Sequence, residues 1–233
     1  DLPPVTRGAK ESVGFATQKP LALLERIIET SSNPGDVVLD PFCGCGTAVV
    51  ASEKLGRRWV GIDVTSLAIG VIEARLGDLF PESNFVVRGV PESRDEAEDL
   101  ARRDPFQFQW WAAGRVGALP HDGRNKKGPD KGIDGIIPFF DDATGRAKRC
   151  IVSVKSGQNI GAGDVRDLLG TVEANKAEAG ALVTLIPPTS AMRAAAAQAG
   201  LYASPLGHDY PRIQILTVDD ILADKLPDLP DQE

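Results

Sequence analysis

Short apolar runs alternate with amphipathic stretches along the first part of the chain, as is typical of an α/β fold. The runs at 37–39 and 59–63 predict strands, and the stretches at 20–30, 47–55 and 66–76 carry apolar residues at helical spacing. We interpret residues 1–80 as a βαβα, partial Rossmann-like half of a doubly wound sheet. Half a sheet leaves an exposed edge and a poorly covered face.

A second pattern of strands and helices begins at residue 105. It predicts an aromatic-rich helix at 106–113, strands at 133–140 and 150–155, a helix at 164–175, a strand at 181–186, a helix at 189–199, a strand at 213–217 and a short helix at 218–223. Aromatic residues at helical spacing favour core packing over base stacking. We therefore expect a second α/β domain over 105–224, preceded by a charged linker at 81–104, whose residues 92–103 are expected to form a solvated helix, and followed by a tail at 225–233.

The turn between the first strand and its helix reads Asp-Pro-Phe-Cys-Gly-Cys-Gly-Thr over residues 40–47. Gly44 and Gly46 let the backbone approach a ligand, and the following helix start offers unpaired N–H groups. Asp63 ends the next strand about 20 residues on, where an acid that binds ribose hydroxyls is expected. Because these features agree, we interpret the turn as part of a ligand pocket rather than as a purely structural turn.

This turn resembles the S-adenosylmethionine (SAM) loop of DNA amino-methyltransferases, which modify the exocyclic nitrogen of adenine or cytosine. Thr-Gln-Lys-Pro at 17–20 is similar to their companion motif, which begins a helix that closes over the cofactor. The resemblance covers the first third of the chain. It implies SAM as the cofactor, in a pocket lined by Lys19, Asp40, Phe42, Gly44, Gly46, Thr47 and Asp63.

The catalytic Asp-Pro-Pro-Tyr motif of the same family is not matched by Asp1-Leu2-Pro3-Pro4, because an extra leucine intervenes and no aromatic residue follows. In the family, that aromatic residue stacks on the flipped-out base. Where Thr-Gln-Lys-Pro precedes the glycine loop, the catalytic motif lies well upstream. We therefore expect this chain, which does not begin with methionine, to be a fragment that lacks it.

Polar residues interrupt two predicted neighbouring strands in the second half. Ser153 and Lys155 point to one face of their strand, and Asp134 lies between apolar neighbours on the paired strand. A lysine at the end of an apolar strand is costly unless it has a partner or a task. The residues alone leave two interpretations: a structural salt bridge, or a site where Asp134 holds a divalent metal and Lys155 orients a water.

The order helix, hairpin, helix, strand, with Gly-Ile-Asp-Gly and Val-Lys on the paired strands, resembles the restriction-endonuclease-like fold. The Mrr-type branch of the Asp…(Glu/Gln)-x-Lys nucleases is the closer likeness, over residues 128–199. It implies a catalytic centre of Asp134, Ser153 and Lys155, with Mg²⁺ at Asp134, and makes a homodimer plausible. The family has Glu or Gln where this chain has Ser153, a poorer metal ligand, and Asp130 or Gln158 are candidate substitutes.

Charge and cysteine content add to this picture. The formal net charge is −7, yet residues 115–131 hold five lysines and arginines against two aspartates. Lys126, Lys127 and Lys131 are candidate DNA phosphate contacts, and a merely solvated loop is an equally good interpretation. Three cysteines form no framework, and with the two histidines they fit no zinc spacing. With no secretory signal and no apolar run long enough for a membrane, we expect reduced thiols and a cytoplasmic protein.

We expect, in sum, a fragment of a restriction–modification protein. Part of a SAM-dependent DNA amino-methyltransferase would be joined to a magnesium-dependent endonuclease acting on double-stranded DNA. The alternative from another class is a non-catalytic DNA-binding or assembly module with a degenerate nuclease centre. A small-molecule methyltransferase is a weaker alternative, disfavoured by the Thr-Gln-Lys-Pro motif.

Overall fold

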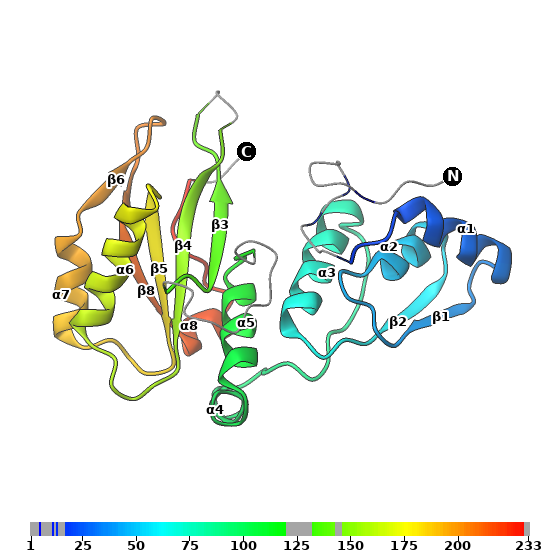
Figure 1. Ribbon diagram of the computed structural model, residues 1–233, viewed down its shortest axis with the longest axis horizontal. Coiled ribbons are helices and arrows are strands. Elements are labelled where there is room, and N and C mark those ends of the chain that lie inside the picture. The colour runs from blue at the N-terminus through cyan, green and yellow to red at the C-terminus, as the bar shows by residue number, and fades with distance from the viewer. Residues whose placement is uncertain are drawn as a thin grey trace. The chain divides into compact units, whose positions relative to one another are not determined.

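A computed structural model of the chain describes residues 5, 11, 13, 17–119, 132–142 and 146–230. The chain divides into two compact units, the first ending at Val90 and the second beginning at Pro91 (Figure 1). Across the described residues, no helix combines the length and the apolar character that a membrane crossing requires.

The first unit follows the predicted alternation of helices and strands. Its elements are α1 (Leu21–Ser31), β1 (Val37–Asp40), α2 (Thr47–Lys54), β2 (Arg58–Gly61) and α3 (Ser66–Leu79). β1 and β2 form a two-stranded parallel sheet in which Leu39 is paired with Val60. Thr65, the residue before α3, caps this helix by accepting a hydrogen bond from the N–H of Ala68.

One face of the β1–β2 sheet is packed and the other is bare among the described residues. Cys43, Val49, Ile72 and Leu76 form the buried core, against which Trp59, Phe80 and Phe85 pack. Alternate strand residues point the other way and stay exposed although they are apolar: Val37, Leu39, Val60 and Ile62 are 47–60% exposed. The unit therefore has the uncovered face expected of half a sheet.

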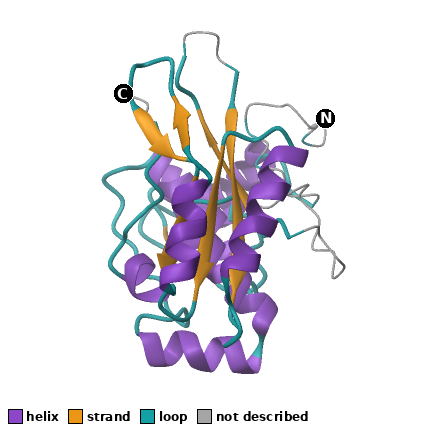
Figure 2. Cartoon of the chain, turned by 90° about the vertical axis from the view of Figure 1, so that its left-hand side faces the viewer, coloured by secondary structure: helices purple, strands orange, loops and turns teal. Residues whose placement is uncertain are grey.

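The second unit is a four-stranded mixed sheet with helices on both faces. Its elements are α4 (Arg94–Arg103), α5 (Pro105–Arg115), β3 (Gly135–Phe139), β4 (Lys148–Lys155), α6 (Ala162–Ala174), β5 (Ala179–Thr184), α7 (Ser190–Gln198), β6 (Leu201–Ala203), β7 (Asp209–Pro211), β8 (Ile213–Thr217) and α8 (Val218–Leu222). The sheet order is β3-β4-β5-β8, with β3 antiparallel to β4 and the other pairs parallel. α6 and α7 cover one face and α5 the other. Figure 2 views the sheet from the side that carries α6 and α7, and helices lie in front of the strands there.

The core of the second unit lies between the sheet and its helices. All six residues of β5 are buried, as expected for a central strand covered on both sides. The predicted aromatic helix is α5, where Phe108 and Trp111 are buried, which confirms their core role. The short hairpin of β6 and β7 was not predicted, because three-residue strands give too little alternation.

Helix α4 differs from the solvated linker helix that the sequence predicted. Ala97, Leu100 and Ala101 are buried, and the helix packs against α5 and α8. Arg94 also donates to the carbonyl of Leu185 and pairs with Asp219 at 2.6 Å. Three apolar residues at helical spacing are enough to dock the helix, although charged residues surround them in the sequence.

A buried polar network ties the β6–β7 hairpin to the end of β3. The fully buried carboxylate of Asp141 pairs with Lys148 and accepts from the hydroxyl of Tyr202, which in turn accepts from Lys148 at 2.9 Å. Burial raises the pKa of the Asp141 carboxyl, but hydrogen bonds from Lys148, Tyr202 and Ser204 outweigh it and hold this pKa below its ordinary value. Asp141 is thus charged at neutral pH and compensated by Lys148.

Candidate functional site

The glycine turn after β1 depends on two left-handed backbone positions. Gly44 has φ +50° and Gly46 has φ +72°, and the N–H of Gly46 donates to the carbonyl of Cys43 at 2.8 Å. A Cβ on Gly46 would lie 2.5 Å from Cγ1 of Ile72, whereas a Cβ on Gly44 would have no neighbour within 4 Å. Gly46 is therefore needed for packing against α3, and Gly44 leaves open backbone on the turn.

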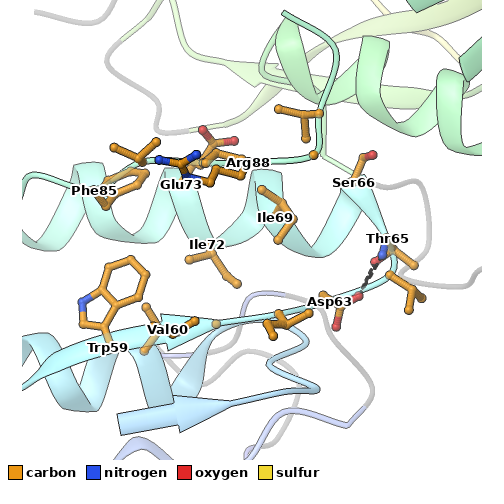
Figure 3. Close-up of a pocket in the computed structure, with 18 residues that line it drawn as sticks. Trp59, Val60, Asp63, Thr65, Ser66, Ile69, Ile72, Glu73, Phe85 and Arg88 are labelled. Carbon is orange, nitrogen blue, oxygen red and sulfur yellow. Dashed lines mark hydrogen bonds between the residues drawn. The ribbon is translucent and has the colours of Figure 1, made fainter. Parts of the chain in front are cut away.

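Asp63, the acid that follows β2, contacts this turn directly. Its Oδ2 accepts from the N–H of Gly44 at 2.9 Å. Its Oδ1 accepts from the N–H and the hydroxyl of Thr65 at 3.0 and 2.9 Å (Figure 3). Asp40 shapes the same turn by accepting from the N–H of Phe42 at 3.1 Å. The two motifs that the sequence placed apart are thus joined by a charge-assisted hydrogen bond.

A cavity of about 350 Å³ lies beside β2 and α3, a size within the range of small-molecule sites. Ile69 and Ile72 of α3 point toward β2 in Figure 3, with Asp63 at one end of the cavity. The further lining includes Trp59, Ser66, Glu73, Phe85 and Arg88. Of the predicted cofactor residues, Asp63 is the one that appears in the described lining. Sequence reasoning missed Phe85 and Arg88 because residues 85–90 were assigned to the linker.

The remaining predicted cofactor residues occupy different environments. Phe42 is 85% exposed, which leaves its ring available to a ligand. Thr47 is buried at the start of α2, with its Oγ1 3.6 Å from the sulfur of Cys45, and the N-cap of this helix makes no side-chain hydrogen bond. Lys19 is exposed and donates to the carbonyl of Thr17 at 3.1 Å, within its own motif.

Gln18 is a functional candidate that sequence reasoning did not single out. Its amide accepts from the N–H of Val13 at 2.9 Å and donates to the carbonyl of Glu11. The carboxylate of Glu11 accepts in turn from the N–H of Leu21 at 3.0 Å, at the start of α1. These hydrogen bonds hold the Thr-Gln-Lys-Pro motif at the start of α1. Gln18 could have been identified from the sequence, because it lies within that motif.

The buried thiol of Cys43 is not set up as a nucleophile. Burial, and then the nearby Asp63 and Asp40 carboxylates, raise the pKa of this thiol to about 11. A thiol with such a pKa stays protonated at neutral pH. The groups that the turn can offer to a ligand are therefore its backbone N–H groups and its carboxylates.

The second predicted site lies on the β3–β4 ladder. Asp134 Oδ2 accepts from the N–H of Val154 at 2.6 Å, and the N–H of Asp134 donates to the carbonyl of Val152 at 2.8 Å. Ser153 is only 4% exposed, and Lys155 is half-buried at the strand end. The structure thus places Asp134 against the strand that carries Ser153 and Lys155.

Metal ligands are scarce around this ladder. In the part of the chain that the structure describes, no group of three or more histidine, cysteine, aspartate or glutamate side chains could hold a metal ion. Gln158 is exposed. Asp130, Lys126, Lys127 and Lys131 lie outside the described residues. The described side chains therefore give no support to a magnesium centre at this ladder.

Two family models match the chain. Residues 1–73 match the model described as a DNA methylase, and residues 118–223 match the one described as NACHT-associated inactive Restriction Endonuclease 1. The Mrr-type likeness is not confirmed by the second match, whose description names an inactive relative of restriction enzymes.

Curated relatives of the first unit are type II methyltransferases. M.HinfI of Haemophilus influenzae is 46% identical over 71 residues, 30% of this chain and 20% of the relative. M2.DpnII of Streptococcus pneumoniae is 50% identical over 60 residues, 26% of this chain and 22% of the relative. The chain therefore spans about a fifth of the length of these relatives.

Solved structures match the same region. The complex of M1.HpyAVI with SAM is 39% identical, with a TM-score of 0.29, and the match covers 30% of this chain and 35% of that chain. A putative DNA modification methylase from Thermus thermophilus is 35% identical, with a TM-score of 0.28 and coverage of 30% and 29%. On the sequence matches, the first unit carries a segment homologous to the DNA methyltransferases of restriction–modification systems, and the second unit carries a segment similar to an inactive restriction-endonuclease-like family.

Proposed function

We propose that the first unit binds SAM as the cofactor-binding part of a DNA amino-methyltransferase. The observation that carries this proposal is the hydrogen bond from the N–H of Gly44 to the carboxylate of Asp63. It brings the glycine turn and the second acid into one site, and the match of residues 1–73 to DNA methylases supports the same ligand.

The residues of the turn fit such a cofactor. The open backbone at Gly44 and the uncapped start of α2 offer close approach and N–H donors. Asp63 accepts through both oxygens already, yet each carboxylate oxygen has a second lone pair that a ribose hydroxyl can use. Asp40, Gly46 and Thr47 hold the turn, and Phe42 and Lys19 would contact the ligand at its exposed side. SAM, when bound, supplies the methyl group.

Calorimetric titration of SAM into the purified chain tests this proposal. Asp63→Asn should weaken binding by about tenfold or more, because a charge-assisted hydrogen bond to the turn is lost. Asp36→Asn is the matched control, since Asp36 accepts from the N–H of Asn33 in a turn before β1. Absence of SAM binding by the parent, or equal losses in the two variants, would contradict the proposal.

The chain alone should not methylate DNA, because its sequence contains no Asp-Pro-Pro-Tyr motif to hold the target base. The measurement is transfer of a labelled methyl group to double-stranded DNA. Detectable transfer would overturn the interpretation of the first unit as a cofactor-binding part.

We propose that the second unit is a non-catalytic DNA-binding module. Ser153 stands where the similar nucleases carry a carboxylate or amide, and it is buried in β4. Asp134 accepts from the N–H of Val154, and among the described residues no cluster of three or more His, Cys, Asp or Glu side chains accompanies it. The family match to an inactive endonuclease model points the same way. Magnesium-dependent cutting, expected from the sequence, has no support among these residues.

Incubation of the parent with methylated and unmethylated plasmid, with magnesium or manganese, tests the second unit. We expect retention of DNA that weakens as salt rises, and no cutting. Cutting that both Asp134→Ala and Lys155→Ala abolish would establish a nuclease instead. No retention at low salt would exclude DNA binding. The homodimer stays a prediction, which light scattering with and without DNA would test.

A further inference from the structure

Arg75 is a buried cation that the cofactor site does not yet explain. It lies in α3, is 8% exposed, and donates through Nη1 to the carbonyl of Cys45. Among the described residues, no carboxylate forms an ion pair with it at salt-bridge distance. Burial lowers the pKa of the Arg75 guanidinium. Cys45 and Glu11 act in the opposite direction but do not outweigh the effect of burial. Burying a charge destabilises a fold, so an apolar residue at this position would give a more stable unit unless the hydrogen bond to Cys45 has a role.

The bond from Arg75 completes a set of contacts that hold the glycine turn. Cys43 donates its N–H to the carbonyl of Ile62 at 3.0 Å, and Gly44 donates to Asp63 at 2.9 Å. Arg75 donates to the carbonyl of Cys45, the next residue of the turn. Three positions earlier on the same helix, Ile72 lies where a side chain at Gly46 would clash.

We propose that Arg75 is a positioning residue that presets the glycine turn before a ligand arrives. A turn with two left-handed glycines has many alternative conformations, and fixing one carbonyl and two N–H groups removes most of them. A ligand that meets a preformed turn need not supply the free energy of ordering it. The part of this inference that concerns SAM affinity rests on the proposed function, whereas the part that concerns the free turn does not.

Amide hydrogen exchange in the ligand-free chain tests the turn directly. Arg75→Met should accelerate exchange at Gly44 and Gly46 by about tenfold or more, the size expected for loss of a hydrogen bond to a charged group. Arg57→Met is the matched control. Arg57 is 7% exposed in the same unit, but donates to the carbonyls of Leu55 and Ser32 at 2.7 and 2.8 Å.

The control variant should change exchange at the turn only as much as it changes exchange across the whole unit. Arg75→Lys keeps a charged donor and should exchange at a rate between those of the parent and Arg75→Met. Equal turn exchange in the two methionine variants, or a lysine variant as fast as Arg75→Met, would overturn the proposal. If Arg75→Met does not fold, Arg75→Lys and Arg57→Lys provide the same comparison.

A second experiment measures the affinity of the same variants for SAM by titration. Arg75→Met should weaken SAM binding by about tenfold, while Arg57→Met should leave it within about twofold of the parent. Unchanged affinity in Arg75→Met would overturn the link to the cofactor. Failure of the parent to bind SAM would count against the proposed function alone, because the exchange measurement still decides whether Arg75 holds the turn.

Discussion

Alanine at Gly46 should damage the first unit far more than alanine at Gly44, although both glycines belong to one turn. Both positions have a left-handed φ, which costs an alanine about 1–2 kcal/mol. At Gly46 the new methyl group would also lie 2.5 Å from Cγ1 and 3.2 Å from Cδ1 of Ile72, and overpacking of this kind costs about 1–3 kcal/mol. We therefore expect a loss of roughly 2–5 kcal/mol for Gly46→Ala and about 1–2 kcal/mol for Gly44→Ala.

Hydrogen exchange read by mass spectrometry suits this comparison, because peptides within residues 17–90 report the opening free energy of the first unit separately from the second. The energy of the contact between the new methyl group and Ile72 is then measured with the additional substitution Ile72→Ala. The double variant Gly46→Ala/Ile72→Ala should be more stable than the sum of its single changes predicts, by about 1 kcal/mol or more. No such coupling should exist between Gly44→Ala and Ile72→Ala.

Equal losses for the two alanine variants would refute this reasoning, because they would mean that the left-handed backbone, and not the contact with α3, sets the cost. Additive effects of Gly46→Ala and Ile72→Ala would refute it independently. SAM titration of the same variants links stability to function. Gly44→Ala should fold and yet bind SAM more weakly, because its methyl group occupies open space on the turn where we place the ligand.

The second unit offers three further tests, each read by urea unfolding or by exchange in its own peptides. Asp141→Asn should cost about 1–3 kcal/mol at pH 7, because it removes the buried carboxylate that Lys148 contacts and leaves this lysine with Asp142 at 3.3 Å as its charged partner. Because the native pKa of Asp141 is depressed, the stability difference between the parent and Asp141→Asn should shrink as the pH falls below 3.8 and through that lower pKa. A stability difference that stayed constant down to about pH 2 would contradict the pairing. Gly180→Ala should cost about 1–3 kcal/mol, as its methyl group would meet three core side chains at 2.9–3.1 Å, whereas Gly170→Ala on the exposed face of α6 should stabilise by about 0.5–1 kcal/mol. Leu100→Ala in α4 should cost about 2–5 kcal/mol, and a loss under about 1 kcal/mol would mean that the helix is only loosely docked.

The order of elements could be predicted because local periodicity decides it. Strand β5 carries apolar residues or glycine at every position before Thr184, and helix α6 repeats its apolar residues at helical spacing. The docking of α4 could not be predicted, because three apolar residues among seven charged ones look like a solvated helix until α5 and α8 are in place. The β6–β7 hairpin could not be predicted for a related reason, because a tertiary contact of Tyr202 with Asp141 holds it in place.

The glycine turn could be predicted as a site because its chemistry is local: left-handed glycines, an acid after the next strand and a helix start. The contact between Gly44 and Asp63 follows from two adjacent parallel strands, whose carboxyl ends meet at one edge. Arg75 and the cavity lining could not be predicted, because an arginine in a helix usually faces solvent. Its burial is visible only once α3 is packed against the turn.

The replacement at Ser153 is consistent with the packing of its strand. Residues Cys150 to Val154 of β4 are all buried, so a glutamate at 153 would place a charge in an apolar layer unless a metal or a cation offset it. A serine removes that cost, and the strand can pack without any ion. Lys155, by contrast, lies at the strand end and remains half-exposed, so water can solvate its ammonium without a carboxylate partner. β4 thus carries an uncharged residue where burial makes a charge most unfavourable and a cation where solvent reaches it, an arrangement that agrees with the non-catalytic role that we propose for the second unit.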